Sequence, residues 1–168
     1  MPGKVWLVVA EARWEESLAQ DMIAVSLGPP QRYALVAAPA LLARVGRPEV
    51  PEDLLDKPCL GLRFRGRAVQ PWEFERDGRV VKIVPNGPLV ALHIGLQLRA
   101  ALDGVGFLAT FEGYVRDAVS DGRLVSVLDA WLPPFPGPFL YYPSRRQPPP
   151  SLAAFVAFVA EWRRQHDP

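Results

Sequence analysis

Hydrophobic residues along the chain fall into short runs that proline and glycine separate. Compact runs rich in β-branched and aromatic residues predict strands, and these runs cover residues 5–9, 22–27, 31–39, 59–64, 72–76, 79–84, 106–110 and 123–128. The Asp77-Gly78 pair between two of them is typical of a two-residue hairpin turn. Apolar residues spaced by three or four predict helices over 39–48, 92–104, 111–122 and 151–164, and a helical turn over 51–58. This alternation predicts an α/β fold with a mostly parallel sheet.

The segment at residues 133–150, PPFPGPFLYYPSRRQPPP, places an aromatic run between two groups of prolines. Because proline has no amide proton, the prolines before Phe139 are expected to delay strand pairing until that residue, and Pro143 is expected to end it. The prolines at 148–150 indicate a stiff connector into a last helix capped by Ser151. We therefore expect the chain to cross between two lobes here and at Pro29-Pro30.

Composition and charge narrow the class of protein. The 168 residues are 49% hydrophobic and carry a formal net charge of +1. Such a chain is long and apolar enough to form a core, and it lacks the basic field with which proteins hold phosphate backbones or anionic lipid. The apolar run before Glu11 is too short for a signal peptide or a membrane span. These features predict a cytoplasmic protein that binds neither DNA nor membranes directly.

Candidate chemistry is sparse in this sequence. Cys59 is the single cysteine, which excludes an internal disulfide, and its position in an apolar run favours a buried small side chain over a nucleophile. Glu11, Glu15 and Glu16 have no companions at metal-ligand spacing and are interpreted as solvated. His93 is either an effector contact or an ordinary satisfied polar residue. The sequence therefore predicts no catalytic residue, no metal and no cofactor.

Several stretches taken together resemble one family. WEFERDGRVVKIVPNGPL, LRAALDGVGFLA and DGRLVSVLDAWLPPFPGPFLYYPSRRQ are similar, in unbroken order, to the effector-binding domain of LysR-type transcriptional regulators. The similarity extends over about residues 13 to 164. It implies a type 2 periplasmic-binding-protein-like α/β fold, in which two Rossmann-like lobes are joined by two crossing strands and an effector cleft lies between them.

The resemblance also implies how the lobes are divided. Residues 29–146 form the second lobe in this interpretation, and residues 1–28 with 147–168 form the first. Family members begin with a winged helix-turn-helix, and neither this region nor the first strand, first helix and second strand of the first lobe has a counterpart before residue 13. We therefore expect an incomplete first lobe, without the helix N-terminus that relatives use to bind an anion.

The same resemblance places six residues on the effector cleft. They are Arg13, Trp14, Leu92, His93, Thr110 and Phe111. Leu92-His93 stands where relatives usually have Asn-Asp, and Phe111-Glu112 stands where a proline usually follows the strand. Both departures remove or replace polar groups. We therefore expect a small-molecule effector that binds weakly, or a different and more apolar one.

The function implied is that of a non-catalytic module for small-molecule sensing or regulatory interaction. One alternative is a freestanding partner that associates with intact regulators and inhibits or tunes them, and another is the remnant of a truncated regulator gene. A solute-binding protein and an enzyme are weaker alternatives, because the sequence shows neither a signal peptide nor a catalytic constellation.

The last helix suggests how the chain assembles. Its apolar stripe consists of Leu152, Phe155, Val156, Val159 and Trp162. In an incomplete lobe this stripe loses part of its cover, and the strand at 5–9 or 22–27 becomes a sheet edge. We expect a homodimer in which the two first lobes complete each other, by strand addition or by packing of the last helices. The alternative is that the N-terminal 12 residues fold back over the gap.

Overall fold

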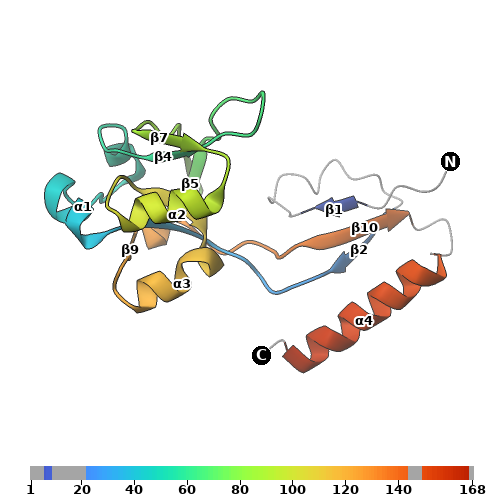
Figure 1. The fold of residues 1–168 in the computed structure, drawn as a ribbon. Helices are drawn as coiled ribbons and strands as arrows, with labels where there is room; N and C mark the ends of the chain where they lie inside the picture. The colour runs from blue at the N-terminus through green and yellow to red at the C-terminus, as the bar shows by residue number, and fades with distance from the viewer. Residues whose placement is uncertain (1–5, 9–21, 144–148, 167–168) are drawn as a thin grey trace. The chain divides into compact units, whose positions relative to one another are not determined.

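The computed structural model describes residues 6–8, 22–143 and 149–166, and the contacts of the chain divide it into two compact units (Figure 1). Unit 1 contains residues 1–31 and 134–168, and unit 2 contains residues 32–133. Residues 29–31 and 134–143, assigned to the second lobe from the sequence, therefore group with unit 1. These residues group with unit 1 because Gln31 forms a backbone bridge with Phe135, and because the strand at 139–143 belongs to the unit 1 sheet.

Unit 1 is built on a three-stranded antiparallel sheet of order β1-β10-β2. Its strands are β1 (Trp6–Val8), β10 (Phe139–Pro143) and β2 (Met22–Ser26). One or other of β1 and β2 was predicted to be a sheet edge, and among the described strands both lie at the outside of this order. The central strand, β10, buries Leu140 and Tyr141.

Backbone pairing begins earlier along the proline-rich segment than predicted. Phe135 stands between two prolines, yet its amide donates to the Gln31 carbonyl at 2.9 Å, and the Gln31 amide donates to the Phe135 carbonyl at 2.9 Å. The carbonyl of Pro138 accepts from the Leu27 amide at 2.8 Å. The strand itself spans Phe139–Pro143, as predicted. The expectation of no pairing before Phe139 was wrong, because a proline removes only its own amide and leaves its carbonyl and the residues between prolines able to pair.

The last helix, α4 (Pro150–His166), has a wider apolar face than the described part of unit 1 covers. It begins at Pro150, whose fixed φ suits a first helical turn, so Ser151 lies inside the helix and is not the predicted cap. In the predicted stripe Val159 is buried, whereas Leu152 and Val156 are half-buried. The exposed large side chains of α4 are Phe155, Phe158 and Trp162, at 46%, 64% and 43%.

Unit 2 alternates short strands and short helices. In chain order its elements are β3 (Tyr33–Ala37), α1 (Pro39–Val45), the 3-10 helix η2 (Pro51–Leu54), β4 (Leu60–Leu62), β5 (Trp72–Arg76), β6 (Arg79–Ile83), β7 (Leu89–Ala91), α2 (Ile94–Leu102), β8 (Leu108–Phe111), α3 (Glu112–Ser120), β9 (Val125–Val127) and the 3-10 helix η3 (Asp129–Trp131). The predicted strands and helices of this unit are confirmed to within a few residues at their ends. The sequence analysis missed β7 and η3.

The sheet of unit 2 is mixed. β3 pairs antiparallel with β8 on one side and with β9 on the other. β4 pairs parallel with β7, and a parallel bridge between Cys59 and Phe107 links β4 to β8, so the strand order is β7-β4-β8-β3-β9. The prediction of a mostly parallel sheet is wrong at β3, which is antiparallel to both of its neighbours. The chain passes through α3 from β8 to β9, and β3 lies between these two strands and runs opposite to both.

The two faces of this sheet carry separate clusters of buried side chains. Successive residues of β3 point to opposite faces, so Leu35 belongs to one cluster and Val36 to the other. The cluster of Leu35 contains Trp72 and Trp131. The cluster of Val36 includes the inner residues of α2 and α3. The sheet is therefore fixed from both sides.

The β5–β6 hairpin covers the first of these clusters. It turns at Asp77 and Gly78, whose φ values of 53° and 77° are those of the predicted two-residue turn. The guanidinium groups of Arg76 and Arg79 lie 5.9 and 5.6 Å from the ring centre of Trp131. These cation–π contacts attach the hairpin to η3.

Candidate functional site

The carboxyl ends of β7, β4 and β8 lie at one edge of the unit 2 sheet, where β3 begins. Tyr33 of β3 pairs with Phe111 of β8, and the Arg63 amide donates to the Ala91 carbonyl at 3.2 Å, which sets Arg63 beside Leu92. The parallel bridge between Cys59 and Phe107 places β4 next to β8, whose last residue is Phe111. Leu92, Arg63, Phe111 and Tyr33 thus follow one another across four strands. We call these four residues the strand-end row.

The strand-end row offers aromatic and apolar surface. The rings of Tyr33 and Phe111 are stacked, with centroids 4.7 Å apart and an angle of 21° between their planes. Tyr114 meets Phe111 edge-on at 6.3 Å. Tyr33 and Phe111 are half-buried, whereas Leu92 and Tyr114 are 58% and 57% exposed. A flat apolar group has stacking partners here.

Two helices begin at the same edge, and the chain itself caps one of them. The His93 Nδ1 accepts a hydrogen bond from the Gly95 amide at 3.1 Å, which makes His93 the N-cap of α2. The sequence left two interpretations of His93 open, an effector contact and an ordinary polar residue with its hydrogen bond satisfied. This contact favours the second. α3 begins after Phe111 without a side-chain cap, and its Glu112 amide donates to the Arg32 carbonyl at 2.9 Å.

The structure brings four of the six predicted effector residues to this edge: Leu92, His93, Thr110 and Phe111. Thr110 is only 6% exposed, so its side chain belongs to the interior below the strand-end row. Arg13 and Trp14 lie outside the described residues.

Sequence reasoning missed the other two members of the row. Arg63 lies near the end of the predicted strand 59–64 and directly follows β4, and that position was a usable signal, because the ends of parallel strands gather at one edge. Tyr33 carried no comparable signal. Its place beside Phe111 follows from the register of β3 against β8, which the sequence does not show.

Gln97 positions α2 against the sheet below this edge. It is 3% exposed, and its Nε2 donates to the Gly61 carbonyl of β4 at 2.8 Å. We expect Gln97→Leu to lower the free energy of unfolding by about 1 to 2 kcal/mol, because the buried carbonyl loses its donor. Urea denaturation measures this change. The control is Gln70→Leu at an exposed position, whose free energy of unfolding is expected to stay within about 0.5 kcal/mol of that of the parent. Equal effects at both positions contradict the stabilising role of the Gln97 hydrogen bond.

Cys59 is buried, with its Sγ 3.7 Å from the Leu54 carbonyl oxygen. Desolvation raises the pKa of its thiol to about 12, against a smaller lowering by the hydrogen bond with Asn86. A thiol that stays protonated is a poor nucleophile. The predicted burial of Cys59 is confirmed.

This raised pKa predicts a pH dependence of stability. Above pH 9 the thiol of the unfolded chain loses its proton, whereas the folded thiol keeps it up to about pH 12. The cysteine's contribution to stability is thus complete below pH 9, and the free energy of unfolding falls by about 1.4 kcal/mol per pH unit above it. Other groups titrate in this range, so the difference between parent and Cys59→Ala is measured by denaturation at several pH values. A difference independent of pH contradicts this prediction.

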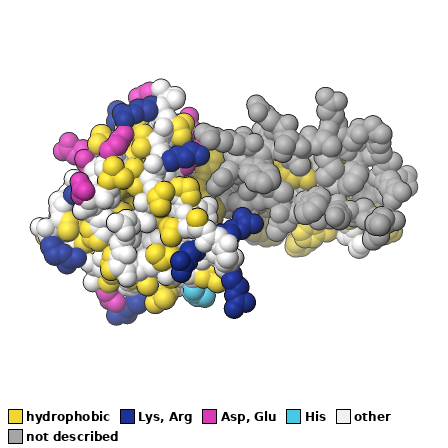
Figure 2. Space-filling model, turned by 90° about the horizontal axis from the view of Figure 1, so that it is seen from above, with side chains coloured by type: hydrophobic (Ala, Val, Ile, Leu, Met, Phe, Trp, Pro, Cys, Tyr) yellow, Lys and Arg dark blue, Asp and Glu magenta, His cyan; other side chains and the backbone are white. Residues whose placement is uncertain are grey.

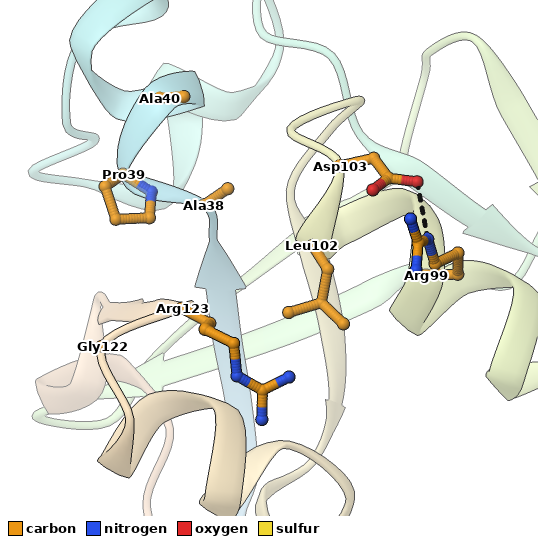
Figure 3. Close-up of a pocket in the computed structure, with 8 residues that line it drawn as sticks. All are labelled: Ala38, Pro39, Ala40, Arg99, Leu102, Asp103, Gly122 and Arg123. Atoms are coloured by element: carbon orange, nitrogen blue, oxygen red, sulfur yellow. Dashed lines mark hydrogen bonds and ion pairs between the residues drawn. The ribbon is translucent and has the colours of Figure 1, made fainter.

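An open depression of about 480 Å³ lies at the opposite edge of the sheet, around the start of α1 (Figure 3). Arg99 of α2 and Arg123 of the α3–β9 connection line it. Arg99 pairs with Asp103 at 2.8 Å, and Arg123 pairs with Asp121 at 2.9 Å. Because each guanidinium is neutralised by a neighbouring carboxylate, this depression concentrates no charge.

The comparisons with known proteins identify the fold around the strand-end row. The model of the LysR substrate binding domain family matches residues 7–164. The chain belongs to this family. The regulatory domain of AphB from Vibrio vulnificus, a solved structure, matches this LysR substrate-binding domain with a TM-score of 0.73 and 22% identity, over 94% of this chain and 74% of that chain. The predicted type 2 periplasmic-binding-protein-like α/β fold is confirmed.

Most of the curated relatives are regulators by name. A Pseudomonas aeruginosa protein named as a transcriptional regulator is 40% identical over 148 residues, which are 88% of this chain and 48% of that protein. YagP of Escherichia coli, named for a LysR family substrate binding domain, is 38% identical over 109 residues, which are 64% of this chain and 79% of YagP. The LysR substrate-binding domain described here spans about half the length of most curated relatives that it matches.

Among the described residues, His, Cys, Asp and Glu side chains do not gather in threes where a metal ion would be held. None of the described helices combines the length and the apolar character needed to cross a membrane.

Proposed function

We propose that this LysR substrate-binding domain is a non-catalytic, cytoplasmic sensing module whose unit 2 binds a small-molecule effector at the strand-end row. The observation that carries the proposal is the convergence of three strand ends, two helix starts and a stacked aromatic pair at one edge of the sheet. In open α/β sheets, ligands bind outside the carboxyl ends of the strands. Leu92, His93, Thr110 and Phe111 form or adjoin this edge.

Several observations support a regulatory role rather than an enzymatic one. Relatives of the chain are named as transcriptional regulators. The buried thiol of Cys59 stays protonated, and His93 uses one ring nitrogen to cap a helix. The depression lined by Arg99 and Arg123 holds internally paired charges. These groups have structural roles. We therefore infer that the strand-end row binds a ligand and does not catalyse a reaction.

The proposal includes partners of two kinds. The first is the effector, altered from the usual ligands of the family because Leu92 is apolar and exposed. The second is another copy of this chain, docked on the exposed face of α4. Its charged residues Glu161, Arg163 and Arg164 lie in the last third of the helix, so an antiparallel pair of helices keeps like charges apart.

A freestanding partner of intact regulators is the second candidate. One relative supports it: YagP, of which this chain spans 79%, is named for the LysR family substrate binding domain. The two candidates differ in solution. A partner of intact regulators is expected to form mixed dimers with a full-length relative such as YcaN, and the sensing module is expected to bind ligand by itself. With a net charge of +1, neither is expected to retard operator DNA alone.

Calorimetric titration of the whole chain with small organic acids, amides and amines tests the sensing function. We expect at least one compound to bind in the micromolar range and Phe111→Leu to weaken it about tenfold, since stacking on the ring is lost. The control is Phe64→Leu, an exposed aromatic outside the row, which is expected to leave the affinity unchanged. If no compound binds, or if Phe111→Leu binds the compound as tightly as the parent, the strand-end row is not the effector site.

A further inference from the structure

Asparagine occurs once in the chain, at Asn86, and glycine follows it. Asn86 and Gly87 lie in the connection between β6 and β7, and both residues are exposed. In an Asn-Gly pair the backbone nitrogen of glycine can attack the side-chain carbonyl carbon of asparagine, because glycine has no side chain that hinders the approach. The sequence thus places one reactive pair in an accessible segment of unit 2.

The two reacting groups of this pair are free in the structure. Among the described residues, neither the side-chain amide of Asn86 nor the backbone amide of Gly87 has a hydrogen-bond partner. Residues 84–88 belong to neither a helix nor a strand, so a ladder of backbone hydrogen bonds does not fix the pair. The Asn86 side chain can therefore rotate toward the Gly87 nitrogen.

Two Asp-Gly pairs, in which the same attack is conceivable, are held in place. The Gly104 amide donates to the Ala101 carbonyl at 3.0 Å. The carboxylate of Asp103 before it pairs with Arg99 at 2.8 Å. The pair at residues 121 and 122 is held in the same two ways. The Asn-Gly pair differs from both because its attacking nitrogen and its side chain are unengaged.

The fold itself requires glycine at position 87. A β-carbon there would lie 2.6 Å from the Cys59 backbone nitrogen and closer still to the Cys59 carbonyl oxygen. The Cys59 amide also donates to the Asn86 carbonyl at 2.9 Å, which holds the connection against the residue that precedes β4. Packing therefore keeps the residue that makes the pair reactive.

We propose that Asn86 is a site of spontaneous deamidation, with water as the co-reactant. The Gly87 nitrogen bonds to Cγ of Asn86, the bond from Cγ to Nδ2 breaks, and Nδ2 leaves as ammonia with the proton of the Gly87 amide. Water then opens the five-membered imide at one of its two carbonyl carbons, and the imide nitrogen regains a proton. Opening at Cγ gives aspartate, and opening at the backbone carbonyl gives isoaspartate.

The two products differ in their effect on the fold. Aspartate adds one negative charge, and Figure 2 shows basic and acidic side chains interspersed on the surface of unit 2, where water solvates a further carboxylate. Isoaspartate inserts the β-carbon of residue 86 into the main chain, directly before the glycine that packs against Cys59. The longer chain is expected to break the hydrogen bond between Cys59 and residue 86 and to disturb the parallel pairing of β7 with β4.

Incubation of the whole chain at mildly alkaline pH, in water enriched in oxygen-18, tests the proposal. Fragment mass spectra are expected to show the heavy oxygen in residue 86 and in none of the glutamines, because glutamine must close a larger ring. We expect the chain to react at a rate within about tenfold of that of a free peptide with the sequence of residues 82–90, since the pair reacts without unfolding. A slower reaction of the chain overturns the proposal, because the fold then protects Asn86.

Two variants serve as controls. Asn86→Gln keeps a side-chain amide and is expected to lose the reaction. Asn86→Asp carries the new charge on an ordinary backbone, and its urea midpoint is expected to equal that of the parent. The isoaspartyl protein, separated by chromatography, is expected to unfold at lower urea, and its Cys59 amide to exchange hydrogen at least about tenfold faster than in the parent. Heavy oxygen at residue 86 without any isoaspartate overturns the attack by Gly87.

Discussion

Replacing Gly137 by alanine is expected to lower the free energy of unfolding by about 3 kcal/mol or more, which is a large share of the stability of a small domain. A β-carbon at this position would lie 2.2 Å from the Pro29 carbonyl oxygen and 2.6 Å from that of Gly28. Gly137 is buried, and the pairings of Pro138 with Leu27 and of Phe135 with Gln31 hold the backbone on both sides of it. The contact is with backbone atoms, so a side-chain rotation does not relieve it.

Gly113→Ala provides the matched control for this substitution. Gly113 lies in the first turn of α3, and a β-carbon added there meets no atom within 4 Å. Alanine favours helix over glycine by about 1 kcal/mol, so this variant is expected to be as stable as the parent or slightly more stable. Urea denaturation followed by tryptophan fluorescence measures both variants. A Gly137→Ala protein as stable as Gly113→Ala contradicts the close backbone approach that the structure shows.

Much of this fold was predictable from local pattern, and the exceptions have physical causes. The Asp77-Gly78 turn and the runs at 72–76 and 79–84 carry their signals in neighbouring residues, so the hairpin was predicted correctly. β7 was missed because its three residues are too few to show a period, and the parallel partner β4 stabilises it from a distance in sequence. The direction of β3 was missed because it depends on which strands flank it, which local pattern does not encode.

The candidate site was predictable in part, for the same reason. Leu92, His93, Thr110 and Phe111 were found through their positions in a family resemblance, and the sheet places them at one edge. The capping role of His93 depends on the φ and ψ of a single turn and on the rotamer of one ring, which no pattern predicts. Arg63 was within reach, because it lies near the carboxyl end of the predicted strand 59–64, and ligands bind outside that end of a sheet. Tyr33 required the register of two strands far apart in sequence.

Phe158→Asp is expected to convert a dimer of this chain into a monomer. Phe158 is the most exposed of the three large side chains on the outer face of α4, at 64%, and lies between Phe155 and Trp162. Burying side chains of this size contributes about 1.5 to 3 kcal/mol each, which is comparable with the cost of bringing two chains together. We therefore expect a dimer of micromolar affinity, in which the same face of α4 is used by both copies, as two-fold symmetry requires.

A carboxylate at position 158 must either be buried without a partner or keep the two helices apart, and both outcomes weaken the dimer by a hundredfold or more, about 3 kcal/mol. Ala157→Asp makes the same change one residue earlier, where the exposed side chain points about 100° away around the helix, and is expected to leave the dimer intact. Light scattering at about 50 μM gives the mass of each protein, and circular dichroism confirms that α4 still folds in both variants. A monomeric parent chain at this concentration rejects the dimer, and a dimer that survives Phe158→Asp shows that another surface joins the two copies.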